Sequence, residues 1–311
     1  MRRPALAFAA LALAAPLAAQ SGGAPFTVQE TGEGFATLDE AVGSIRMGRG
    51  TILIAPGTYH ECTVQAGGDI VFKAVRPGSV TFDGSPCEDK AIFVLRGRSS
   101  TVDGIIFRGV RVADGNGAGI RTEMGDLTVT NSMFLDSQEG ILGGEPTRQK
   151  IVIDRSTFSG LGTCDEAPDC AHSIYLANKG SVTITRSRFE RGTGGHYVKL
   201  RVPTVRIVDN SFDDTRGAKT NYMIDLPEGG TGVIANNSFV QGRNKENWTG
   251  FIVVAAESKT YRSTGLEVTG NDARLAPGAT RSPAFVASYS RDALAIGDNR
   301  LGAGVRKFET R

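Results

Sequence analysis

The chain has little of several features that common protein classes require. Its 311 residues include only 3 histidines, 1 tryptophan and 4 cysteines. Its 35 basic residues nearly balance its 33 acidic residues, and they form no basic cluster, which argues against nucleic acid as a partner. Beyond the first twenty residues no long apolar run is free of charges, so the sequence predicts a soluble mature protein without a membrane span.

The N-terminus is the one segment with a long apolar run. Residues 1–20, "MRRPALAFAALALAAPLAAQ", combine two arginines, an Ala/Leu-rich stretch and small residues at Ala18 and Ala19. This pattern predicts a secretory signal peptide. We therefore expect residues 21–311 to form one domain that is secreted or periplasmic in a bacterium.

Four cysteines in an exported chain indicate disulfides. Cys164 and Cys170 would close the short loop "TCDEAPDC", and Cys62 and Cys87 are the other two candidates. Zinc binding is the alternative, but the spacing fits no standard zinc motif.

Long helical patterns are also missing, and a repeat takes their place. The segments "LTVTNSMF", "IVIDRSTF", "VTITRSRF", "VRIVDNSF" and "GVIANNSF" end at Phe134, Phe158, Phe189, Phe212 and Phe239. Each alternates apolar and polar residues, as strands do, and copies recur about every 27 residues. Such short units must stack on their neighbours to bury a core. A Ser/Asn column lies two residues before each aromatic position and predicts a structural hydrogen-bond ladder.

The N-terminal part of the domain predicts a lid for this stack. Thr37 and Glu40 form a capping box for a short amphipathic helix, and the segment "TILIAPGTYHECTV" reads as two strands around a turn. These segments, followed by the repeats, resemble the right-handed parallel β-helix proteins of the pectate-lyase-like superfamily. The resemblance implies an all-β, single-stranded right-handed parallel β-helix of about ten coils with a short N-terminal capping helix.

Alignment of the repeats places reactive residue types side by side. If Ile174, Val198 and Ile224 point inward, Tyr175, Lys199 and Asp225 form an outer row of neighbours roughly 5 Å apart. Arg201 flanks this row, and Arg121 and Tyr197 are further candidates for substrate contacts. An ordinary cross-strand ion pair is the alternative reading of the lysine and the aspartate.

Two of the three histidines share one register. His172 and His196 lie two residues before the inward position in adjacent coils. Both histidines and Asp225 are further candidates for the catalytic site. For the histidines, the alternative is a stacked internal pair hydrogen-bonded to turn backbone, and no third histidine lies nearby in register for a metal site.

These groups suit β-elimination from a uronic-acid polymer. Lys199 would take the proton next to the carboxylate, Arg201 would bind that carboxylate, and Tyr175 or His196 would protonate the leaving oxygen. Hydrolysis needs two carboxyl groups at a set separation, and only Asp225 lies in the row. The segment "YVKLRVPTVRIVDNSF" resembles the lysine-containing part of polysaccharide lyase family six, the alginate and chondroitin lyases. Lys199 matches that family's lysine, whereas Asp225 stands where its arginine lies one coil later.

Other stretches leave alternatives open. The acidic loop before His172 offers calcium ligands, a cleft wall or only a solvated surface. Trp248 could stack on a sugar ring or pack under its own loop. The sequence thus favours an exported polysaccharide lyase that needs no cofactor, with a non-catalytic carbohydrate-binding or cell-surface scaffold, or a glycoside hydrolase, as alternatives. A polysaccharide is the expected partner, and oligomeric state is left open.

Overall fold

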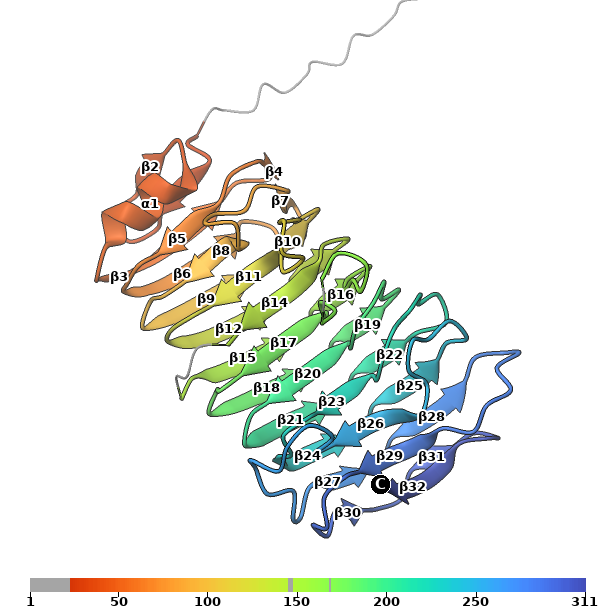
Figure 1. The fold of residues 1–311 in the computed structure, drawn as a ribbon. Coiled ribbons are helices and arrows are strands. Elements are labelled where there is room, and N and C mark those ends of the chain that lie inside the picture. The colour runs from red at the N-terminus through yellow and green to blue at the C-terminus, as the bar shows by residue number, and fades with distance from the viewer. Residues whose placement is uncertain (1–22, 145–147, 168) are drawn as a thin grey trace, which may run out of the picture.

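The computed structural model describes residues 23–144, 148–167 and 169–311, so the predicted signal peptide lies outside the described residues. The described chain winds into an elongated stack of coils in which each coil contributes one strand to each of three sheets (Figure 1). Neighbouring strands within the stack pair in parallel, and only the N-terminal β1 pairs antiparallel. The predicted parallel β-helix is confirmed.

The strands of the described residues divide into three sheets, which we call the first, second and third sheet. In the order of pairing, the first sheet contains β2 (Glu33–Phe35), β1 (Phe26–Val28), β3 (Arg49–Ile54), β6 (Asp69–Ala74), β9 (Ser99–Asp103), β12 (Asp126–Thr130), β15 (Lys150–Asp154), β18 (Ser181–Thr185), β21 (Thr204–Val208), β24 (Thr231–Ala235), β27 (Glu267–Thr269) and β30 (Ala295–Ile296). The second sheet contains β4 (Gly57–Tyr59), β7 (Val80–Asp83), β10 (Ile105–Arg108), β13 (Met133–Leu135), β16 (Thr157–Ser159), β19 (Arg188–Glu190), β22 (Ser211–Asp213), β25 (Ser238–Gln241), β28 (Asp272–Leu275) and β31 (Arg300–Leu301). The third sheet contains β5 (Thr63–Gln65), β8 (Ala91–Leu95), β11 (Ala118–Thr122), β14 (Glu139–Gly143), β17 (Ile174–Ala177), β20 (Val198–Arg201), β23 (Ile224–Leu226), β26 (Gly250–Val254), β29 (Ala284–Ser288) and β32 (Arg306–Thr310).

The core consists of stacked apolar columns. The phenylalanines that end the repeats lie one above another, with ring centroids 4.7 to 5.1 Å apart from Phe107 to Phe239. This spacing matches the separation of adjacent strands, about 4.8 Å. Each ring is thus buried by the coils above and below it, as the repeat predicted.

The N-terminal end of the core is closed by the predicted helix. Helix α1 (Leu38–Ile45) buries Leu38, Ala41 and Val42. The Thr37 side chain accepts a bond from the Glu40 N–H, and the Glu40 carboxylate accepts one from the Thr37 N–H, so the capping box is confirmed.

A ladder of polar side chains runs along the inside of the stack. Asn210 donates its backbone N–H to Asn237 Oδ1 at 2.9 Å, and Asn237 bonds in the same way to Asn271. Ser132, Ser156 and Ser187 continue the column toward the N-terminus. The predicted structural ladder is confirmed.

Two disulfides join the four cysteines, Cys62 with Cys87 and Cys164 with Cys170. In the described part of the chain no helix is both long and apolar enough to span a bilayer.

Candidate active site

A pocket of about 610 Å³ lies on the outer face of the third sheet, over strands β14, β17 and β20. Strands supply its floor, and the turns that enter and leave the sheet supply its walls. Its lining residues are Asp114, Asn116, Glu139, Ala167, Asp169, Cys170, His172, Tyr175, Lys199, Arg201 and Glu257. Most of these carry polar or charged side chains, so the pocket suits a hydrophilic ligand.

Two residues of the predicted outer row, Tyr175 and Lys199, line this pocket together with Arg201. Tyr175 pairs in register with Lys199, and Lys199 with Asp225. Arg201 Nε donates to the Tyr175 hydroxyl at 3.0 Å, and the Lys199 amine and the Arg201 guanidinium each lie 5.8 Å from the centre of the tyrosine ring. The structure therefore brings the predicted tyrosine, lysine and arginine together.

Sequence reasoning missed Glu257, which joins the two cations. Its Oε1 lies 3.0 Å from Lys199 Nζ, and its Oε2 pairs with Arg201. Burial alone would raise the pKa of Glu257, but hydrogen bonds from Lys199 and Arg201 outweigh it and lower the pKa. Glu257 follows β26 in a loop without repeat periodicity, so the sequence offered no signal for it.

The two predicted histidines are both buried, and their ring centroids are 5.0 Å apart. His172 lines the pocket, whereas His196 does not. The backbone N–H of His196 donates to His172 Nδ1 at 3.0 Å. Nδ1 is thus an acceptor, so the ring proton of neutral His172 lies on Nε2. Burial, reinforced by Lys199 and Arg201, lowers the pKa of His172 to about 3, and burial also lowers the pKa of His196. Both rings are neutral.

Asp225 belongs to the row but is buried beneath the pocket. Only 3% of it is exposed, and its Oδ2 lies 3.5 Å from His196 Nε2. Burial raises the pKa of Asp225 to about 7, although Lys199 opposes the shift. Because the pKa of the histidine falls and that of the aspartate rises, burial disfavours an ion pair between protonated His196 and charged Asp225.

The opposite end of the pocket is acidic. Glu139, a residue that sequence reasoning missed, accepts the His172 N–H at 3.4 Å, and burial raises its pKa. It lies in the same register as the two histidines, two residues before inward-pointing Ile141, and that register was the signal that could have found it. Asp114 and Asp169 complete this end.

The disulfide loop forms a wall of the pocket, one of the roles considered for it. Ala167, Asp169 and Cys170 line the pocket. Asp165 instead pairs with Lys219 at 2.8 Å and Glu166 with Arg111 at 2.8 Å, which anchors the loop to other coils. No group of three or more histidine, cysteine, aspartate or glutamate side chains suited to a metal ion occurs among the described residues.

The structure does not bring three predicted contact residues to the pocket. Tyr197 is 1% exposed and its hydroxyl donates to Asp214 at 2.8 Å inside the core, which excludes the predicted substrate contact. Strand β20 begins only at Val198, so the in–out alternation does not extend back to Tyr197. Arg121 lies in the outer row beyond Leu142, and Trp248 lies before β26, but neither lines the pocket.

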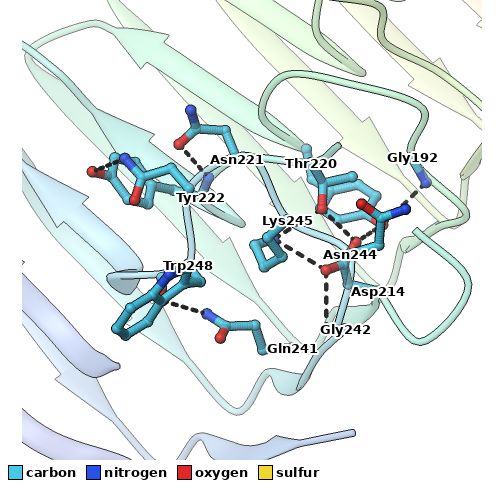
Figure 2. Close-up of polar contacts among 12 residues, drawn as sticks. Gly192, Asp214, Thr220, Asn221, Tyr222, Gln241, Gly242, Asn244, Lys245 and Trp248 are labelled. Atoms are coloured by element: carbon cyan, nitrogen blue, oxygen red, sulfur yellow. Dashed lines mark hydrogen bonds and ion pairs between the residues drawn. The ribbon is translucent and has the colours of Figure 1, made fainter. Parts of the chain in front are cut away.

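A second cluster of buried charges surrounds Asp214 (Figure 2). Lys245 Nζ lies 3.0 Å from Asp214 Oδ2 with both side chains fully buried, and Thr220 donates to Oδ1 at 2.8 Å. The Gly242 N–H and the Tyr197 hydroxyl also donate to this carboxylate. Since every contact is internal, the cluster fixes the segment before Trp248 to the stack.

The comparisons with known proteins agree with this architecture. A family model described as "Right handed beta helix region" matches residues 90–274, more than half of the chain. The chain belongs to the right-handed β-helix family. No curated protein matches this β-helix in sequence.

Two solved structures are similar to this β-helix. The alginate lyase from Paenibacillus sp. str. FPU-7 aligns over 88% of this chain and 95% of its own, with a TM-score of 0.66 and 14% identity. The Streptococcus pneumoniae surface protein and adhesin PfbA aligns over 88% and 94%, with a TM-score of 0.46 and 11% identity. At such identities the first likeness shows a shared fold and nothing finer.

The pocket of this β-helix combines groups that can bind an anion and transfer protons. It presents an amine, a guanidinium and a phenol within one wall, with neutral His172 beside them. An internal carboxylate already lies between the amine and the guanidinium. Binding of a carboxylate and transfer of protons next to it are therefore the chemistry that this arrangement supports.

Proposed function

We propose that this protein is an exported polysaccharide lyase that cleaves a uronic-acid-containing polymer by β-elimination. The observation that carries the proposal is the placement of Lys199, Arg201 and Tyr175 in one pocket, with a carboxylate held between the two cations. The predicted signal peptide and the two disulfides support export.

Each of the three groups has a role in the proposed reaction. Arg201 pairs with the uronate carboxylate and stabilises the negative charge that develops when the neighbouring C5 proton leaves. Lys199, in its unprotonated amine form, takes that proton, and the electron pair forms the C4–C5 double bond as the bond from C4 to the glycosidic oxygen breaks. Tyr175 gives its proton to the departing oxygen, because Arg201 donates to the phenol oxygen and leaves the O–H proton available.

His196, the other predicted proton donor, is less suited to this role. It is buried and does not line the pocket. Asp225 is likewise covered, so it contributes to the environment of Lys199 rather than contacting the substrate. Hydrolysis by two carboxyl groups is the alternative, since Asp114, Glu139, Asp169 and Glu257 also line the pocket.

The test is a turnover assay with alginate, pectate, glycosaminoglycans and bacterial exopolysaccharides as substrates. Turnover is measured as the increase in ultraviolet absorbance that unsaturated uronic products cause. We expect product with one of these polymers. Lys199→Ala should then lower kcat by about 10²-fold or more while the circular dichroism spectrum is retained. Lys150→Ala, at an exposed position of the first sheet, is the matched control and should retain activity.

Two other results would contradict the proposal. Reducing ends without unsaturated product would indicate a hydrolase. Binding of a polymer without any product would indicate the non-catalytic scaffold.

A further inference from the structure

The Glu257 side chain lies where a ligand carboxylate would be expected to lie. Glu257 is the one ion-pair partner of Lys199 among the described residues, and it shares Arg201 with Glu228. Glu228 does not line the pocket, whereas Glu257 does. The pocket-facing positions of both cations are therefore occupied by one internal carboxylate.

The backbone beneath Glu257 is fixed, but its side chain is accessible. The Glu257 N–H donates to the Pro227 carbonyl at 2.8 Å, and the Ala255 N–H donates to the Leu226 carbonyl at 2.8 Å, so the loop is bound to the preceding coil. The side chain itself is 44% exposed, compared with 12% for Lys199 and 19% for Arg201. A rotamer change of Glu257 alone would free the two cations without moving the loop.

We propose that Glu257 is an intramolecular competitor that occupies the carboxylate subsite until a uronate carboxylate displaces it. This inference rests on the proposed function, because that function places the uronate carboxylate on Arg201 and its C5 proton next to Lys199, the two groups that Glu257 bridges. At Arg201 the exchange replaces one charge-assisted hydrogen bond with an equivalent one, so a carboxylate ligand recovers part of what the displacement of Glu257 costs.

The same exchange gives the pocket selectivity. A neutral sugar cannot replace the bonds that Lys199 and Arg201 make to Glu257, so its entry would leave Lys199 without its acidic partner and Arg201 with Glu228 alone. Glu257 thus discriminates against neutral polymers while it weakens the binding of acidic ones.

Glu257→Gln tests the proposal because it keeps the shape of the side chain and removes its charge. Binding is measured by titration calorimetry with tetrasaccharides of galacturonate and of mannuronate, in separate experiments. We expect the Kd for the bound tetrasaccharide to fall roughly three- to ten-fold, which corresponds to the removal of a partly exposed ion pair from each cation. A neutral gluco-oligosaccharide should show no comparable gain.

Glu228→Gln is the matched control, since it removes the other acidic partner of Arg201 and leaves Glu257 in place. We expect less than about a two-fold change in Kd from this variant. Equal gains from the two variants would indicate a general change in charge and would overturn the subsite assignment.

The outcomes separate this inference from the proposed function. Tighter uronate binding by Glu257→Gln without product from any polymer would support the subsite and refute the lyase. Unsaturated product from the wild type, with unchanged or weaker uronate binding by Glu257→Gln, would support the lyase and refute the competitor.

Discussion

At the scale of single residues, Asp225 shows how burial controls charge in this protein. Its carboxyl is buried and faces a neutral histidine, so the charged form loses hydration without gaining a full ion pair. Lys199, its neighbour in register, only partly offsets this cost. The pKa of the Asp225 carboxyl therefore lies near neutral pH, where the group changes between its neutral and its charged form.

The raised pKa of Asp225 predicts a pH-dependent effect of Asp225→Asn on stability. The folded state holds the proton up to about pH 7, whereas the unfolded state releases it near the ordinary value of 3.8, so the contribution of Asp225 to stability falls as pH rises between these values. The amide does not titrate. The stability of Asp225→Asn relative to wild type should therefore increase from about pH 4 to pH 8 by on the order of 2–4 kcal/mol, measured by urea unfolding.

Asp213→Asn is the control, because the pKa of Asp213 is shifted in the opposite direction. Burial alone would raise the pKa of Asp213, but hydrogen bonds from Thr215 outweigh this effect and lower the pKa. This variant should lose stability relative to wild type as pH rises through the acidic range. The same pH trend in both variants would exclude our assignment for Asp225.

At the scale of elements, the asparagine ladder stabilises the bends that join the first sheet to the second. Asn237 accepts from the backbone and the side chain of Asn210 and donates to the Ile207 carbonyl, all inside the core. Its removal would leave buried polar groups of two coils without partners. Such groups cost more than an ordinary lost hydrogen bond.

Asn237→Ala is therefore expected to lower the free energy of unfolding by roughly 2–4 kcal/mol. Arg206→Ala, at an exposed position of β21, should change it by less than about 0.5 kcal/mol. Urea titration of both variants provides the measurement. A change of similar size in the two would show that the ladder does not contribute to stability.

The elements also explain what could be predicted from the sequence. The phenylalanine repeats fix strand register, so the row of Tyr175, Lys199 and Asp225 followed from alternation alone. Tyr197 was misplaced because alternation ends where a turn begins. Glu257 could not be predicted, because the conformation of a loop between coils depends on contacts that no periodic pattern encodes.

At the scale of the whole molecule, each coil contacts mainly the coil before it and the coil after it (Figure 1). Stability in such a stack is approximately a sum of local terms. Damage at one end should therefore remain local rather than unfold the entire chain.

Phe285→Ala tests this expectation near the C-terminal end. Its ring is fully buried in β29 and contacts Phe239 and Phe251, so its loss should cost roughly 3–5 kcal/mol locally. Hydrogen exchange followed by mass spectrometry should show faster exchange in β26, β29 and β32, with β6 and β9 unchanged. A uniform increase along the chain would indicate a single cooperative unit instead.

Corresponding positions of the polar ladder recur at intervals that vary from 23 to 34 residues, although every bond between successive rungs is formed. The extra residues are absorbed in turns outside the sheets, so insertions there change the walls of the pocket without disturbing the strands below. Evolution can in this way remodel what the protein recognises by lengthening or shortening a few turns, while the scaffold that aligns the reactive side chains is inherited intact.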